Sequence, residues 1–115
     1  MLGIIGAMDE EVAMIKAQLT DVQVESRAAM DFYKGKLEGK EVVVVRSGIG
    51  KVNAAMCTQI LADIYSVTGV VNTGIAGSLK AEIDIGDIVL SSDALQHDMD
   101  ATGFGYEPGQ IPRVE

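Results

Sequence analysis

Short apolar runs along the chain alternate with stretches in which apolar residues recur every three or four positions. The short runs predict β-strands, and runs rich in β-branched residues predict strands that are buried on both faces. The segment EVVVVR at residues 41–46 predicts a central strand, and Glu38 and Gly39 before it predict a hairpin turn. Strands are predicted at residues 1–5, 22–27, 31–37, 41–46, 68–71 and 85–95.

Two stretches have the periodicity of amphipathic helices. The first is predicted to begin with Asp9 as its N-cap and to end near Leu19. The second follows the segment SGIGKV at residues 47–52. The apolar positions of the first helix are Val12, Ile15 and Leu19, and those of the second are Val52, Met56, Ile60 and Ile64.

Strands that alternate with helices predict an α/β fold, a mixed central sheet flanked by helices, within one domain over residues 1–115. Three of the strands end in loops that contain glycine. In open α/β sheets, ligands bind outside the carboxyl ends of the strands. The sequence therefore predicts a small-molecule site where these loops meet. The glycines in question are Gly6, Gly48, Gly50, Gly74 and Gly77.

Composition narrows the classes of partner. Nine Lys and Arg against 17 Asp and Glu give a formal net charge of −8, which argues against binding to nucleic acid or to membrane surfaces. No apolar run is long enough to cross a bilayer, and Asp9 to Glu11 are unlike a signal peptide. The single cysteine, Cys57, cannot form an internal disulfide and favours a reducing, cytoplasmic location. On its helix it is expected to be a small buried residue, not a nucleophile.

Several motifs are weak evidence for nucleotide or metal binding. The segment GIIGAMDEEV lacks the G-x-G-x-x-G spacing, and its acids occupy the helix start where a pyrophosphate would bind. In SGIGKV, Val52 follows Lys51 where a P-loop needs Ser or Thr. The segment HDMD at residues 97–100 has one histidine and no zinc-site spacing, so its polar side chains are expected to hydrogen-bond the backbone of a loop.

The acids Asp9, Glu10 and Glu11 have two interpretations. All three can simply stabilise the first helix, because carboxylates are favourable at the positive end of the helix dipole. Glu11 would have a chemical role only if its side chain points into the predicted site. The sequence alone leaves both interpretations open.

Taken in order, the segments GIIGAMDEEV, SGIGKV, NTGIAGSL, GDIVLS and HD…FGYEPGQIP are much more specific than any of them alone. They resemble the 5′-methylthioadenosine/S-adenosylhomocysteine nucleosidases of the purine nucleoside phosphorylase superfamily. The resemblance extends along the whole chain but covers about the N-terminal half of such an enzyme. It implies a nucleoside phosphorylase-like fold. It also implies hydrolysis of the N-ribosidic bond to adenine and a thioribosyl product, without a metal or organic cofactor.

The resemblance also implies roles for individual residues. Glu11 corresponds to the acidic residue that orients and deprotonates the attacking water. Ile75 stands where the family often has Ser near that water, so a hydroxyl contact is expected to be missing. Phe104 and Pro112 correspond to residues that reach the alkylthio pocket of a neighbouring subunit, which implies a homodimer. The full set of substrate-binding positions implied by the resemblance is Met8, Ile49, Ala76, Gly77, Ala101, Phe104 and Pro112.

By the same resemblance, the glutamate that holds the ribose and the aspartate that protonates the purine lie beyond Glu115. The 115-residue chain by itself is therefore expected to be inactive. Two other hypotheses stay open. One is a related purine nucleoside phosphorylase, or a hydrolase of another purine nucleoside. The other, from a different class, is a non-catalytic binding or assembly module.

Overall fold

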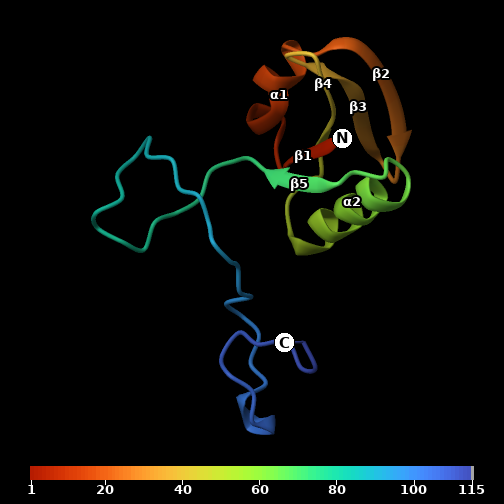
Figure 1. The fold of residues 1–115 in the computed structure, drawn as a ribbon. Coiled ribbons are helices and arrows are strands. Elements are labelled where there is room, and N and C mark those ends of the chain that lie inside the picture. The colour runs from red at the N-terminus through yellow and green to blue at the C-terminus, as the bar shows by residue number, and fades with distance from the viewer. Residues whose placement is uncertain (115) are drawn as a thin grey trace. The chain divides into compact units, whose positions relative to one another are not determined.

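The computed structural model describes residues 1–114, which form two compact units, with the second beginning at Ser78 (Figure 1). Within these described residues, the first unit holds the sheet and both α-helices, whereas the second has a single turn of 3₁₀ helix, η1. No helix in the described part of the chain has the length and apolar character needed to cross a membrane. In chain order the elements are β1 (Leu2–Gly6), α1 (Asp9–Ala17), β2 (Thr20–Arg27), β3 (Met30–Leu37), β4 (Lys40–Arg46), α2 (Lys51–Asp63), β5 (Gly69–Asn72) and η1 (Thr102–Phe104).

The five strands form one mixed sheet in the order β2-β3-β4-β1-β5. Strand β1 pairs in parallel with β4 on one side and β5 on the other, so that Ile4 lies opposite both Val44 and Val71. Strands β2, β3 and β4 pair antiparallel. The hairpin between β3 and β4 turns at Glu38 and Gly39, whose φ angles are 49° and 80°. The predicted mixed sheet, the predicted hairpin and its turn are confirmed.

The sheet is covered by one helix on each face (Figure 1). Because side chains alternate along a strand, Val43 and Val45 pack with α2, whereas Val42 and Val44 pack with α1. All four valines of β4 are at most 4% exposed. The prediction that residues 41–46 form a central, doubly buried strand is therefore confirmed.

Helix α2 covers the sheet with Cys57 and Leu61, and from its predicted apolar stripe Ile60 packs against the same core. Val52 is 81% exposed, and Ile64 is also exposed, whereas Cys57 and Leu61 are fully buried. The reason lies in β1, where Gly3 has no side chain. A Cβ on Gly3 would lie 2.8 Å from Leu61 Cδ1, so the missing side chain makes the space that Leu61 fills.

The strand predicted at residues 85–95 is wrong, because no strand is present there in the described chain. The segment starts in a turn in which the Asp84 N–H donates to Asp87 Oδ2 (2.9 Å), and the side chains of Ile85 and Ile88 are exposed. A strand needs a neighbouring strand to satisfy its N–H and C=O groups. Apolar composition was therefore not enough to make residues 85–95 a strand.

Candidate functional site

The carboxyl ends of the parallel strands β4, β1 and β5 lie side by side at one edge of the sheet. The loops that follow them are tied to β1 by backbone hydrogen bonds. Ser47 N–H donates to Gly6 O, and Thr73 N–H donates to Ile5 O, both at 2.9 Å. The prediction that these three glycine-containing loops share one edge is confirmed.

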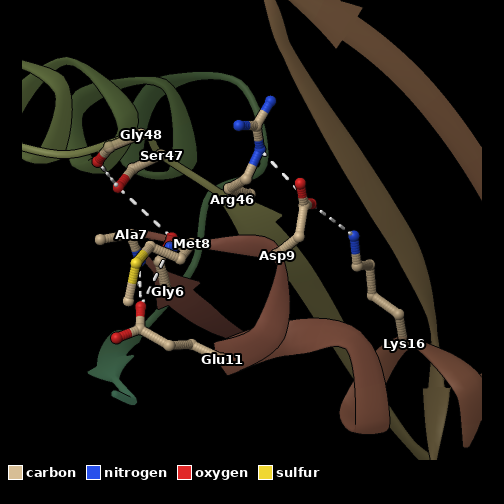
Figure 2. Close-up of polar contacts among 9 residues, drawn as sticks. All are labelled: Gly6, Ala7, Met8, Asp9, Glu11, Lys16, Arg46, Ser47 and Gly48. Carbon is tan, nitrogen blue, oxygen red and sulfur yellow. Dashed lines mark hydrogen bonds and ion pairs between the residues drawn. The ribbon is translucent and has the colours of Figure 1, made fainter. Parts of the chain in front are cut away.

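Glu11 lies at this edge, in the first turn of α1, and its carboxylate accepts three backbone hydrogen bonds. Ala7 N–H and Met8 N–H donate to Oε2 at N···O distances of 2.7 and 3.0 Å (Figure 2). Ile75 N–H, from the loop after β5, donates to Oε1 at 3.2 Å. The first two bonds are those of a glutamate that caps its own helix. The third is not, because it joins α1 to a different loop.

These hydrogen bonds lower the pKa of Glu11, the largest effect coming from Met8 N–H and the next from Ile75 N–H. Partial removal from water acts in the opposite direction, and Ala7 N–H adds a smaller lowering. Glu11 is therefore a carboxylate at neutral pH. A carboxylate has about four acceptor positions, so this one keeps about one for a further donor such as water.

Asp9 has a different role from Glu11, and the prediction that it is the N-cap is wrong. The N-cap is Met8, and Asp9 is the first helical residue. Its Oδ1 lies 3.4 Å from Arg46 Nε and 3.7 Å from Lys16 Nζ, and Figure 2 shows it pointing away from Glu11. Glu11 accepts the N–H groups of Ala7 and Met8, which immediately precede α1, and the side chain of the N-cap residue makes no capping hydrogen bond.

The other predicted site residues divide between the two units. Met8 donates to Glu11, Ile49 is exposed in the loop between β4 and α2, and Ala76 and Gly77 follow Ile75 in the loop after β5. The first unit therefore brings these four positions and Glu11 to the loops of one edge. The remaining three belong to the second unit, where Ala101 is buried, Phe104 is 87% exposed and Pro112 is exposed.

Two features of the edge were missed from the sequence. Ser47 is buried, and its hydroxyl donates to Gly48 O at 2.8 Å, which fixes the start of the loop after β4. Ile75 contacts Glu11 through its backbone N–H, a group that every residue except proline supplies. The serine that begins SGIGKV could have indicated the hydrogen bond of Ser47. The side chain of Ile75 could not have indicated the bond to Glu11, because that bond is made by the backbone.

The segment of residues 97–100 behaves as the loop that was expected. Asp100 Oδ1 accepts hydrogen bonds from Thr102 N–H (3.1 Å) and Thr102 Oγ1 (2.7 Å). These bonds lower the pKa of Asp100, that of the Thr102 hydroxyl most. Among residues 1–114, no three His, Cys, Asp or Glu side chains are grouped so that they could hold a metal ion.

The sequence matches the phosphorylase superfamily over residues 1–115. The chain belongs to this superfamily. It is 51% identical over 114 residues to a 5′-methylthioadenosine/S-adenosylhomocysteine nucleosidase of Staphylococcus haemolyticus, covering 99% of this chain and 50% of the relative. It is 50% identical over 114 residues to a nucleosidase of the same description from Marinomonas, covering 99% of this chain and 49% of that relative. The chain thus spans about half the length of these superfamily relatives.

Solved structures of the superfamily agree with the fold. A nucleosidase from Colwellia psychrerythraea in complex with adenine superposes with a TM-score of 0.95 at 53% identity, over 96% of this chain and 46% of that one. A nucleosidase from Neisseria meningitidis in complex with methylthio-immucillin-A superposes with a TM-score of 0.96 at 38% identity, over 99% of this chain and 49% of that one. A futalosine hydrolase of Helicobacter pylori superposes with a TM-score of 0.90 at 32% identity, over 98% of this chain and 49% of that one. The predicted nucleoside phosphorylase-like fold and the predicted resemblance to the nucleosidases are confirmed.

Proposed function

We propose that this chain contributes the water-activating side of an N-glycosidic hydrolase that cleaves 5′-methylthioadenosine and S-adenosylhomocysteine. The observation that carries this proposal is the Glu11 carboxylate, held by N–H groups from two loops at the edge where three parallel strands end. It is ionised at neutral pH and keeps an acceptor position for a water molecule. The relatives named above, at about 50% identity, supply the substrate class.

The residues fit the chemistry of the reaction. As the C–N bond to the purine breaks, its electron pair leaves with the base and positive charge develops on the sugar. Water then forms the new C–O bond and loses a proton to Glu11. A carboxylate with a lowered pKa is a weak base, so it takes this proton only as the water becomes acidic in bonding to the cationic sugar. By the resemblance, the purine is protonated by an aspartate outside residues 1–115.

The negative charge of Glu11 also bears on the choice of nucleophile. A carboxylate at the nucleophile position repels phosphate, which favours water and therefore hydrolysis over phosphorolysis. The futalosine hydrolase likeness, at 32% identity, makes a hydrolase of another purine nucleoside the second candidate. The higher identity to the 5′-methylthioadenosine/S-adenosylhomocysteine nucleosidases supports their substrates as the first candidates.

We also propose that the substrate contacts Met8, Ile49, Ala76, Gly77 and Ala101, and that Phe104 and Pro112 complete the site of a second subunit. An aromatic ring that is 87% exposed, as in Phe104, suits an interface better than water. The protein is then a cytoplasmic homodimer. Sedimentation of the intact protein should give a dimer, and Phe104→Ser should weaken it or raise the KM for methylthioadenosine. A monomer that binds substrate normally would contradict this.

Product analysis of the intact protein tests the reaction itself. Methylthioadenosine should yield adenine and free methylthioribose at the same rate with and without phosphate. Formation of a sugar 1-phosphate would make it a phosphorylase, and faster turnover of futalosine than of methylthioadenosine would favour the second candidate. A polypeptide of residues 1–115 alone should release no adenine above the uncatalysed rate. Multiple turnovers by that polypeptide would show that no residue outside it is needed.

A further inference from the structure

The Glu11 side chain lies close to two glycines, Gly6 at the end of β1 and Gly74 in the loop after β5. A Cβ on Gly6 would lie 3.0 Å from Glu11 Cβ and 2.7 Å from Val12 Cγ1. A Cβ on Gly74 would lie 2.5 Å from Glu11 Oε1 and 2.7 Å from Glu11 Cδ. The first contact is partly with the core, through Val12. The three atoms nearest to the second Cβ all belong to the Glu11 carboxyl group, and separations of 2.5 and 2.7 Å are shorter than those that real Cβ atoms show.

Gly74 is not required by its backbone conformation, because its φ lies outside the left-handed range. An alanine could adopt the same backbone without strain. The loop is held in place just before Gly74, because Thr73 N–H, one residue earlier, donates to Ile5 O. The three atoms nearest to a Cβ at position 74 all belong to the Glu11 carboxyl group, so this group is what a side chain there would meet first.

We propose that Gly74 is a positioning residue for Glu11. Its missing side chain lets the carboxylate approach the loop after β5 closely enough to accept the Ile75 N–H. This bond determines where Oε1 lies and therefore where a water bound to it would be. The inference rests on the proposed function only in the step from the position of Glu11 to the rate of the reaction.

Gly74→Ala in the intact protein is the direct test. The added methyl group must push the carboxylate away from Ile75, which removes one of the bonds that lower the pKa of Glu11. The Glu11 pKa, followed by ¹³C NMR of its side-chain carboxyl group, should rise toward the ordinary value. Because misplacement by about 1 Å costs on the order of 10²-fold in rate, kcat should fall by about that factor with little change in KM.

Gly69→Ala is the matched control, at the start of β5, the strand that leads into the loop containing Gly74. Its Cβ would lie 3.3 Å from Leu2 Cδ2, the flexible end of an exposed side chain, and it does not contact Glu11. This variant should keep both the wild-type kcat and the wild-type Glu11 pKa. An equal fall of kcat in Gly69→Ala and Gly74→Ala would overturn the proposal, because the effect would then come from a general disturbance of β5 and not from the contact with Glu11.

A double-mutant cycle with Glu11→Ala isolates the contact. Once the carboxylate is gone, Gly74→Ala should lower the residual turnover no further. If Gly74→Ala alone fails to fold, combining it with Glu11→Ala should restore folding, because the methyl group then has space. The proposal would be overturned if Gly74→Ala lowered the turnover of Glu11→Ala as much as it lowers that of the wild type. It would also be overturned if adding Glu11→Ala to a misfolded Gly74→Ala variant did not restore folding.

The NMR readout separates this inference from the function. If Glu11→Gln left turnover intact, the proposed role of Glu11 in catalysis would fail. The raised Glu11 pKa in Gly74→Ala would still establish Gly74 as the residue that positions the carboxylate. An unchanged pKa with unchanged kcat would reject the positioning role.

Discussion

The Glu11 carboxylate accepts a hydrogen bond from the backbone N–H of Ile75, a residue 64 positions later in the chain, at 3.2 Å. This bond joins the start of α1 to the loop after β5 across the edge of the sheet. A glutamate that only capped its helix would need Ala7 and Met8 but not Ile75. The contact therefore favours the chemical interpretation of Glu11 over the purely structural one.

Glu11→Gln should lower the kcat of the intact protein by roughly 10² to 10⁴, the usual contribution of a positioned general base. Nucleoside affinity should change little, since the amide keeps the size of the carboxyl group. Calorimetric titration with methylthioadenosine and steady-state kinetics check the two parts separately. The exposed neighbour Glu10 provides the matched control, because Glu10→Gln removes a charge from the same turn. Near-normal turnover in Glu11→Gln would refute the assignment.

The pH dependence of the reaction should reflect the lowered pKa of Glu11. The folded protein holds the carboxylate form more firmly than the unfolded chain does. The contribution of Glu11 to stability and activity is therefore complete when the pH is above its ordinary pKa of 4.5. It is lost only as the pH falls through the lower pKa that Glu11 has in the folded protein. The acid limb of kcat/KM assigned to Glu11 should lie below pH 4.5, and in Gly74→Ala it should move upward. An acid limb well above 4.5 that disappears in Glu11→Gln would contradict this prediction.

Cys57 should be unreactive in the folded protein. Burial raises the pKa of its thiol to about 11, so at pH 8 about one thiol in a thousand is ionised, and its sulfur is shielded from reagent. A disulfide reagent such as DTNB should label it many times more slowly in buffer than in 6 M guanidinium, where labelling should be complete within minutes. Rapid labelling in buffer would show that α2 detaches readily from the sheet.

Two truncations on α2 test which of its faces packs against the sheet. Leu61→Ala should lower the free energy of unfolding by about 2 to 5 kcal/mol, because it leaves a cavity in the core beside Gly3. Val52→Ala on the exposed stripe should change it by about 0.5 kcal/mol or less. Urea unfolding of the intact protein measures both. The reverse order would mean that the stripe of Val52 and Met56 is the packed face.

Local sequence determined the features that depend on few neighbours. The run at residues 41–46 was predicted to be a central strand because four consecutive β-branched residues suit burial on both faces. Glu38 and Gly39 were sufficient to predict the hairpin turn, because glycine readily adopts the positive φ that Gly39 has there. The gathering of three glycine-containing loops at one edge also followed from the sequence, because parallel strands end on the same side.

Tertiary structure decided what depends on contacts between distant residues. The sequence predicted an apolar stripe on α2, of which Ile60 packs against the core, whereas the fully buried residues are Cys57 and Leu61, with Leu61 in the space left by Gly3. Residues 85–95 have the composition of a strand, yet strand formation needs a paired neighbour, which composition cannot supply. The sequence left the role of Glu11 undecided. Its carboxylate is held partly by the N–H of Ile75, and a backbone group that nearly every residue carries becomes specific only through its position in the fold.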